Sequence, residues 1–178
     1  MSDFAELQET VVRLVEHQQR RYYGKYRGTV SDNDDPDHQG RVRAKVPELF
    51  GDALTGWAMA CVPFAPPGHG MMFLPDNDSM VWIEFEGGNP SRPIWTGCWW
   101  PQDAGTSIGS PAQKTIETKA GHRITLDDTD GSETVRIEDK HGSKISLDQS
   151  GLTLEHGSMK VALTDQQVSI NDGALTVM

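Results

Sequence analysis

The C-terminal third of the chain follows a short-range alternation of apolar and polar positions. From residue 114 onward, pairs of apolar residues flank one polar residue, and turn residues separate the pairs at intervals of 7 to 11 residues. A period of two is typical of β-strands, so residues 114–178 predict a ladder of very short strands. The pairs are Ile124/Leu126, Val135/Ile137, Ile145/Leu147, Leu152/Leu154, Val161/Leu163, Val168/Ile170 and Leu175/Val177.

The apolar face of this ladder has no partner in the predicted segment. Residues 114–178 contain no helix and no second patterned layer that could cover it, and the strand edges would also be exposed. Self-association around a threefold axis solves both problems, because apolar faces meet on the axis and edges pair between chains. We therefore predict that this segment forms a trimer. Its core would consist of Ile124, Leu126, Val135, Ile137, Ile145, Leu147, Leu152, Leu154, Val161, Leu163, Val168 and Ile170.

The N-terminal segment, residues 1–22, predicts an amphipathic helix from residue 2 to residue 22. Phe4, Leu7, Val11 and Leu14 recur with a 3-4-3 spacing that places them in one stripe. The stripe is too short for an independent coiled coil. The helix must therefore pack on its own next domain or on a partner.

Residues 23–100 predict a small β-barrel. Five short candidate strands with Gly/Pro-rich joints suit an OB-type barrel, although the pattern alone does not separate it from an SH3-like barrel. The candidate strands cover residues 23–30, 41–46, 57–62, 80–85 and 94–99. Residues 101–113 have the composition of a linker, and residues 114–178 form the predicted trimeric ladder that follows it. The predicted fold is mainly β.

Composition and charge narrow the possible functions. The 18 glycines and 10 prolines favour turns and short strands. The net charge of −10 repels phosphate backbones, so we expect no nucleic-acid partner. The sequence has neither an apolar leader nor a stretch of about 20 apolar residues, which predicts synthesis in the cytoplasm without a signal peptide. Cys61 and Cys98 have apolar neighbours and are predicted to be buried free thiols.

No pattern of residues predicts catalysis, a metal site or a cofactor. The acidic run at residues 32–37 lacks the glycine and glutamate that an EF-hand loop requires, and predicts a solvated hairpin loop. The sequence lacks a nucleophile motif and a metal-spaced set of His and Cys residues. Trp82, Trp95, Trp99 and Trp100 could form a stacking platform, but core and subunit contacts explain their clustering as well.

Three motifs in order resemble those of the phage-baseplate and VgrG-type spike family, over roughly residues 23–175. Residues 34–47, DDPDHQGRVRAKVP, resemble the "DP…GRV-x-V" first hairpin of its OB domain. Residues 70–75, GMMFLP, and 81–97, VWIEFEGGNPSRPIWTG, resemble the family's "P-x-x-G-D-x-V-W-V-x-F-x-G-G-D-P-x-R-P-x-x-x-G" core. Residues 121–128, GHRITLDD, look like the start of the trimeric spike that follows the OB domain, so the resemblance implies an intertwined trimeric β-helix or β-prism for residues 114–178.

The resemblance implies a non-enzymatic homotrimer in a contractile injection machine. Its OB domains would dock on a tube-hub protein of the baseplate, and its spike would be driven through the target-cell envelope, often with a small PAAR-repeat cap. Some relatives carry a lysozyme domain between the two parts, and some bind iron through His-x-His near the tip. The short linker and the histidine spacing here match neither feature. We therefore expect no catalytic, cofactor or metal residues.

The last strand predicts where a cap would bind. Threefold symmetry would place three copies of Leu175, Val177 and Met178 side by side as an apolar platform that needs a cover. An alternative function is an OB module that binds carbohydrate or oligonucleotide and uses the tail as a trimerisation stalk. A third is a β-helical polysaccharide depolymerase. The sequence leaves open whether the machine is a phage tail, an extracellular particle or a secretion system.

Overall fold

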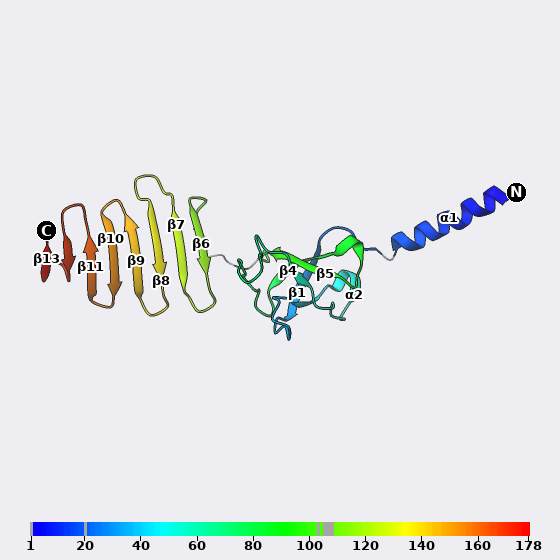
Figure 1. Ribbon diagram of the computed structural model, residues 1–178, viewed down its shortest axis with the longest axis horizontal. Coiled ribbons are helices and arrows are strands. Elements are labelled where there is room, and N and C mark those ends of the chain that lie inside the picture. The colour runs from blue at the N-terminus through cyan, green and yellow to red at the C-terminus, as the bar shows by residue number, and fades with distance from the viewer. Residues whose placement is uncertain (1, 20, 103, 105–108) are drawn as a thin grey trace. The chain divides into compact units, whose positions relative to one another are not determined.

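The computed structural model describes residues 2–19, 21–102, 104 and 109–178, in two compact units divided between residues 104 and 105. The predicted mainly β fold, with an N-terminal helix, a small barrel and a C-terminal ladder of strands, is confirmed (Figure 1). The first unit contains α1 (Ser2–Gln19), β1 (Tyr26–Asp32), β2 (Arg43–Lys45), α2 (Pro47–Phe50), β3 (Met59–Ala60), β4 (Met80–Phe85), the 3-10 helix η1 (Glu86–Gly88) and β5 (Pro93–Cys98).

The barrel of the first unit is a five-stranded sheet with the order β2-β1-β4-β5-β3. All neighbours are antiparallel except β3 and β5, which are parallel. Single bridges from Val42 to Ala58 and from Lys45 to Leu54 bring the segment before β3 back to β2. The two ends of the strand order therefore meet, which removes most of the exposed sheet edge.

The barrel core follows the alternation that the sequence shows. Val42, Ala44 and Val46 are fully buried, as predicted for one face of their strand. Along β4, Val81, Ile83 and Phe85 point inward while the residues between them are half-buried. The remaining buried core residues are Val30, Ala58 and Trp95.

The predicted helix ends three residues early, because the chain is fixed to the barrel directly after it. The backbone N–H of Tyr22 donates to the carbonyl of Gly88 at 2.9 Å, and the Tyr22 ring packs edge-on against Phe50. A residue held in this way cannot continue a helical turn. The short helix α2 was not predicted, although Pro47 at its first position and Gly51 after its last are typical boundary residues.

The second unit is an eight-stranded antiparallel sheet in which each strand pairs only with its neighbours in the chain. Its strands are β6 (Gln113–Glu117), β7 (Arg123–Asp127), β8 (Thr134–Glu138), β9 (Ser143–Asp148), β10 (Gly151–His156), β11 (Met159–Leu163), β12 (Val168–Ile170) and β13 (Leu175–Val177). All seven predicted apolar pairs lie within strands of this sheet. The predicted linker, residues 101–113, falls partly outside the described residues, and Gln113 already belongs to β6.

Candidate functional site

The C-terminal sheet places its apolar side chains on one face. Directly paired residues of antiparallel strands share a face, as do alternate residues within one strand. The pairings therefore join the predicted core residues into two rows that cross the strands. The first row consists of Ile116, Ile124, Ile137, Ile145, Leu154, Val161, Ile170 and Leu175. The second consists of Leu126, Val135, Leu147, Leu152, Leu163, Val168 and Val177.

Both rows remain open in a single chain. Eight of the predicted core side chains expose between 36% and 46% of their surface: Ile124, Leu126, Ile137, Ile145, Leu147, Leu154, Leu163 and Val168. A hollow of about 610 Å³ follows part of the first row, and its apolar lining includes Ile116, Ile137 and Val161. A continuous apolar surface of this kind marks a contact with another molecule.

The opposite face carries a ladder of alternating charge. From β6 to β11 the paired positions are Glu117, Arg123, Glu138, Lys144, Glu155 and Lys160. Arg123 bonds Glu117 at 2.8 Å, and Lys144 bonds Glu155 at 2.8 Å. The Lys144 ammonium, as hydrogen-bond donor, lowers the pKa of the Glu155 carboxyl. Every step of this ladder pairs opposite signs, so a slip in register would separate these pairs.

A row of mostly small residues, with Arg136 as its one charged member, runs beside the charge ladder on the same face. Its members are Thr115, Thr125, Arg136, Ser146, Thr153, Ala162, Ser169 and Thr176. Such residues have little apolar area to bury, so this face gains little from being covered. The two faces of the sheet therefore differ in what they can contact.

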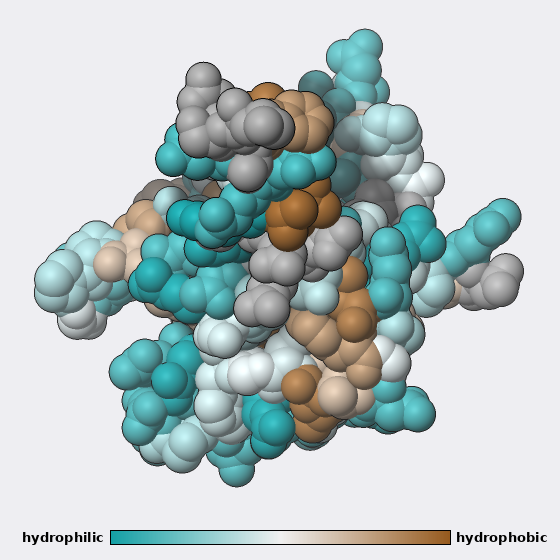
Figure 2. Space-filling model, turned by 90° about the vertical axis from the view of Figure 1, so that its right-hand side faces the viewer, coloured by the Kyte–Doolittle hydropathy of each residue, from teal (hydrophilic) through white to brown (hydrophobic). Residues whose placement is uncertain are grey.

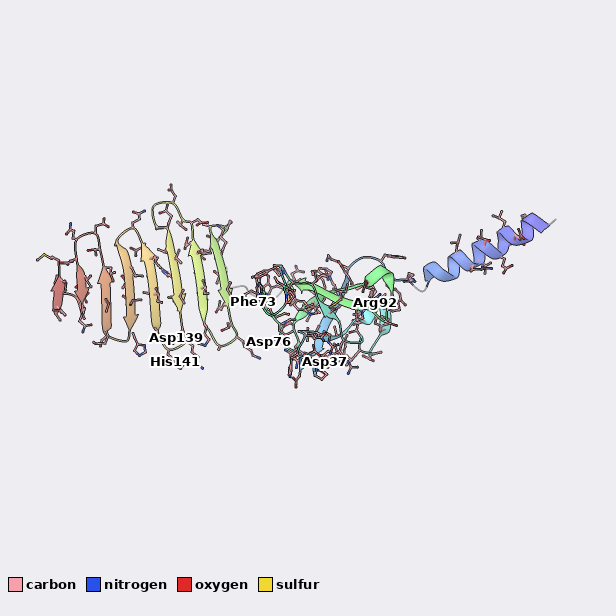
Figure 3. All side chains as sticks on the ribbon, viewed as in Figure 1. Asp37, Phe73, Asp76, Arg92, Asp139 and His141 are labelled. Atoms are coloured by element: carbon pink, nitrogen blue, oxygen red, sulfur yellow. The ribbon has the colours of Figure 1, made fainter. Side chains whose placement is uncertain are left out.

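Turns of the sheet are fixed by local hydrogen bonds. Figure 3 labels Asp139 and His141, which lie at the hairpin turn between β8 and β9. One carboxylate oxygen of Asp139 accepts the backbone N–H groups of His141 at 2.9 Å and Ser143 at 2.8 Å. The N–H of Ser143 holds the pKa of Asp139 below its usual range. Asp139 is thus a turn-forming residue, and its low pKa reflects that role.

The predicted cap residues lie on the last strand of the sheet. Leu175 and Val177 continue the two apolar rows and are more exposed than the interior members, and Met178 is fully exposed. Among the described strands, β13 pairs only with β12. This end of the sheet therefore combines apolar side chains with an unpaired edge.

The prediction that residues 32–37 form a solvated loop is wrong for Asp35, which is only 4% exposed. The Asp35 carboxylate accepts backbone N–H groups from Asp37, Gln39 and Arg41, and the Arg41 guanidinium binds it at 2.5 Å. The Arg41 hydrogen bond holds the pKa of Asp35 far below its usual range. Asp37, labelled in Figure 3, binds Arg41 from the exposed side at 2.5 Å. Because both oxygens of the Asp35 carboxylate accept hydrogen bonds, this residue fixes the loop.

The tryptophans do not form one stacking platform. Trp95 is buried, and its indole N–H donates to the carbonyl of Gly40 at 3.0 Å. Trp82 and Trp99 contact each other with ring centroids 5.9 Å apart, and Arg27 lies 4.7 Å from the Trp99 ring. Trp100 is exposed. A buried Trp95 and a covered Trp99 do not offer aromatic faces to bases or sugars.

The prediction that both cysteines are buried is wrong. Cys61 and Cys98 are free thiols, and both are exposed. Cys98 is the last residue of β5, and Cys61 follows β3 directly. Both therefore lie where a strand leaves the barrel, which their apolar sequence neighbours did not reveal.

Within the part of the chain that the structure describes, no three His, Cys, Asp or Glu side chains lie close enough to hold a metal ion. Among the same residues, no helix combines the length and apolar character needed to cross a membrane.

Family models match both units of the chain. A model described as the type VI secretion system and phage-baseplate injector OB domain matches residues 26–100, from β1 to just beyond β5. A model described as the phage baseplate V C-terminal trimerisation domain matches residues 113–176, from β6 into β13. A search of curated proteins found no match. The first match identifies the barrel as an OB domain, and the second assigns trimerisation to the sheet with the two apolar rows.

Proposed function

Because the chain belongs to the baseplate spike family of phages and type VI secretion systems, we propose that it is the central spike of a contractile injection machine. The family gives it a structural role in a baseplate and a trimerisation domain. The proposal adds that the trimer docks on the tube hub and is driven through the target envelope. The machine is a phage tail, an extracellular injection particle or a secretion system.

The observation that carries this proposal is the pair of apolar rows on one face of the C-terminal sheet. The first row continues across all eight strands and the second from β7 to β13, and in one chain they have no cover among the described residues. Three sheets around a common axis would bury the rows against one another, while the charge ladders face outward. A dry core along the axis suits a shaft that must not bend under load.

The two ends of this trimer would bind different partners. The loop before β4 exposes Phe64, Met72 and Phe73, and Figure 3 labels Phe73 on this loop. Apolar side chains also break up the hydrophilic surface on the face shown in Figure 2. We assign the OB domain and this loop to the hub contact. Leu175, Val177 and Met178 would receive a PAAR-type cap.

The proposed spike has no enzymatic activity. Its family consists of structural baseplate proteins, and the low-pKa carboxylates of this chain are used in turns and ion pairs. The alternative of a carbohydrate- or oligonucleotide-binding module would need exposed aromatic faces. The burial of Trp95 and the covering of Trp99 by Arg27 remove two of the four tryptophans from a common stacking platform, which does not favour this alternative.

The test is the mass of the full-length chain in solution. Light scattering should give three chains of 19.6 kDa for the wild type. The double variant I145D/L147D should fall apart, because three copies would place six carboxylates in the apolar core. The matched control T125D/T153D puts two aspartates on the opposite face and should remain trimeric. A folded wild-type monomer at micromolar concentration would refute the proposal, as would an unchanged mass in both variants.

A further inference from the structure

Helix α1 presents an apolar stripe for which the described residues provide no cover. Phe4, Leu7, Val11 and Leu14 lie along one side of the helix and expose 49–67% of their surface. Val15 widens the stripe and is also exposed. A helix of 18 residues with such a face is marginal in water unless the face is packed against something.

The spacing of the stripe is that of a coiled-coil seam. With Phe4 and Val11 at the a positions of a heptad, Leu7 and Leu14 occupy the d positions. The flanking positions that would meet between helices include Gln8 and Thr10, which are uncharged. Identical helices could therefore pack side by side without repulsion between like charges at these positions.

Except for Asp3, which precedes Phe4 at a flanking g position, the charged residues of the helix lie away from the seam. Glu6, Glu9 and Arg13 occupy outer heptad positions. Arg13 bonds Glu9 at 2.8 Å, so that pair is satisfied within its own helix. A partner with a charged groove would meet few opposite charges near the apolar stripe. A second copy of the same stripe would instead bury apolar side chains against it.

A homotrimer would supply those copies at short range. Only residue 20 separates α1 from Arg21, whose guanidinium donates to the carbonyl of Gly87 at 2.8 Å. Tyr22, next in the chain, donates its backbone N–H to Gly88. Each helix is therefore tethered closely to its own barrel, and a short tether gives an effective concentration in the millimolar range.

We propose that the three α1 helices of the trimer pack on one another through Phe4, Leu7, Val11 and Leu14, as a short parallel three-helix bundle. The proposal rests on the homotrimer of the proposed function. A threefold axis makes the helices parallel and in register, so each a or d residue meets its own copies. The seam spans about two heptads, which is too short to set the number of chains by itself. The C-terminal sheet therefore fixes the trimer, and the α1 helices pack together within it.

Disulfide crosslinking of the full-length chain tests this arrangement. In a C61S/C98S background, one cysteine is placed in the seam, L14C, and the matched control R13C places it on the opposite side of the helix. Light scattering first establishes that both variants are trimers. Under mild oxidation we expect L14C to form a covalent dimer, seen on a non-reducing gel, at least tenfold faster than R13C. L7C, a second seam position, should behave as L14C does.

The possible results separate this proposal from the one on which it rests. Trimers in which L14C, L7C and R13C crosslink at equal rates would overturn the helix bundle and leave the spike trimer intact. That is also the result expected if α1 docks on its own barrel or awaits a hub protein. A wild-type chain without trimeric mass would instead refute the proposed function itself.

Discussion

The substitution I145A tests whether the apolar rows of the C-terminal sheet are buried in the assembled protein. Ile145 lies in the middle of the first row, between Ile137 and Leu154, and exposes 37% of its surface in a single chain. Full burial of an isoleucine contributes about 1.5–3 kcal/mol. If the row stayed open, I145A would remove only part of this, about 1 to 2 kcal/mol per chain.

A covered row gives a larger cost. If three chains enclose Ile145, the substitution also leaves a cavity, and Ile-to-Ala changes in enclosed cores cost about 2–5 kcal/mol per chain. Three copies of the change occur together in one trimer. The control T153A, on the polar face, should cost less than about 0.5 kcal/mol.

Equilibrium unfolding in guanidinium chloride, followed by circular dichroism at several protein concentrations, separates these outcomes. The unfolding midpoint of a trimer rises with protein concentration, whereas that of a monomer does not. We expect I145A to lower the free energy of unfolding by more than about 2 kcal/mol per chain, with a concentration-dependent midpoint. A loss near 1 kcal/mol at a midpoint independent of concentration would show that the row remains open.

Two further predictions concern electrostatics. The folded-state pKa of Asp35 lies below its unfolded value of about 3.9, so its contribution to stability is present above pH 4 and is lost as the pH falls further. D35N should therefore lower the melting temperature at pH 7, with a difference from wild type that shrinks below pH 4; a constant difference down to pH 2 would contradict this. K144E would place a glutamate between Glu138 and Glu155, so that three carboxylates are adjacent in the ladder, and should lower the melting temperature, with partial recovery at about 0.5 M salt. A loss that salt does not change would show that the ladder acts through packing instead.

Sequence patterns predicted the strands of the C-terminal sheet because a period of two is a local property. The pairs Ile145/Leu147 and Leu152/Leu154 can be recognised in the sequence without knowing which strands lie beside them. The charge ladder was missed, although a signal existed: Lys144 and Glu155, of opposite sign, each lie directly outside such a pair. It becomes visible only when the register of the strands is known.

Burial in the barrel was harder to predict because it depends on contacts that are distant in the chain. The run around Asp35 has the composition of an exposed turn, yet Arg41 and three backbone N–H groups enclose its carboxylate. The opposite error occurred for Cys61 and Cys98, which were predicted to be buried and are exposed. Their apolar neighbours do not reveal that a strand is leaving the barrel. The C-terminal end of α1 was also hard to predict, because it depends on the hydrogen bond between Tyr22 and Gly88, which are distant in the chain.

The strand order of the C-terminal sheet makes the length of the spike adjustable in steps of two strands. Each strand contacts only its neighbours in the chain, so removing β9 and β10 would bring β8 and β11 together in the antiparallel sense that they need. Glu138 would then face Lys160, and opposite charges would still meet. Loss or duplication of a hairpin thus preserves strand direction, the apolar face and the order of charges at once. Evolution could lengthen or shorten such a shaft to match the thickness of a target envelope without redesigning either end.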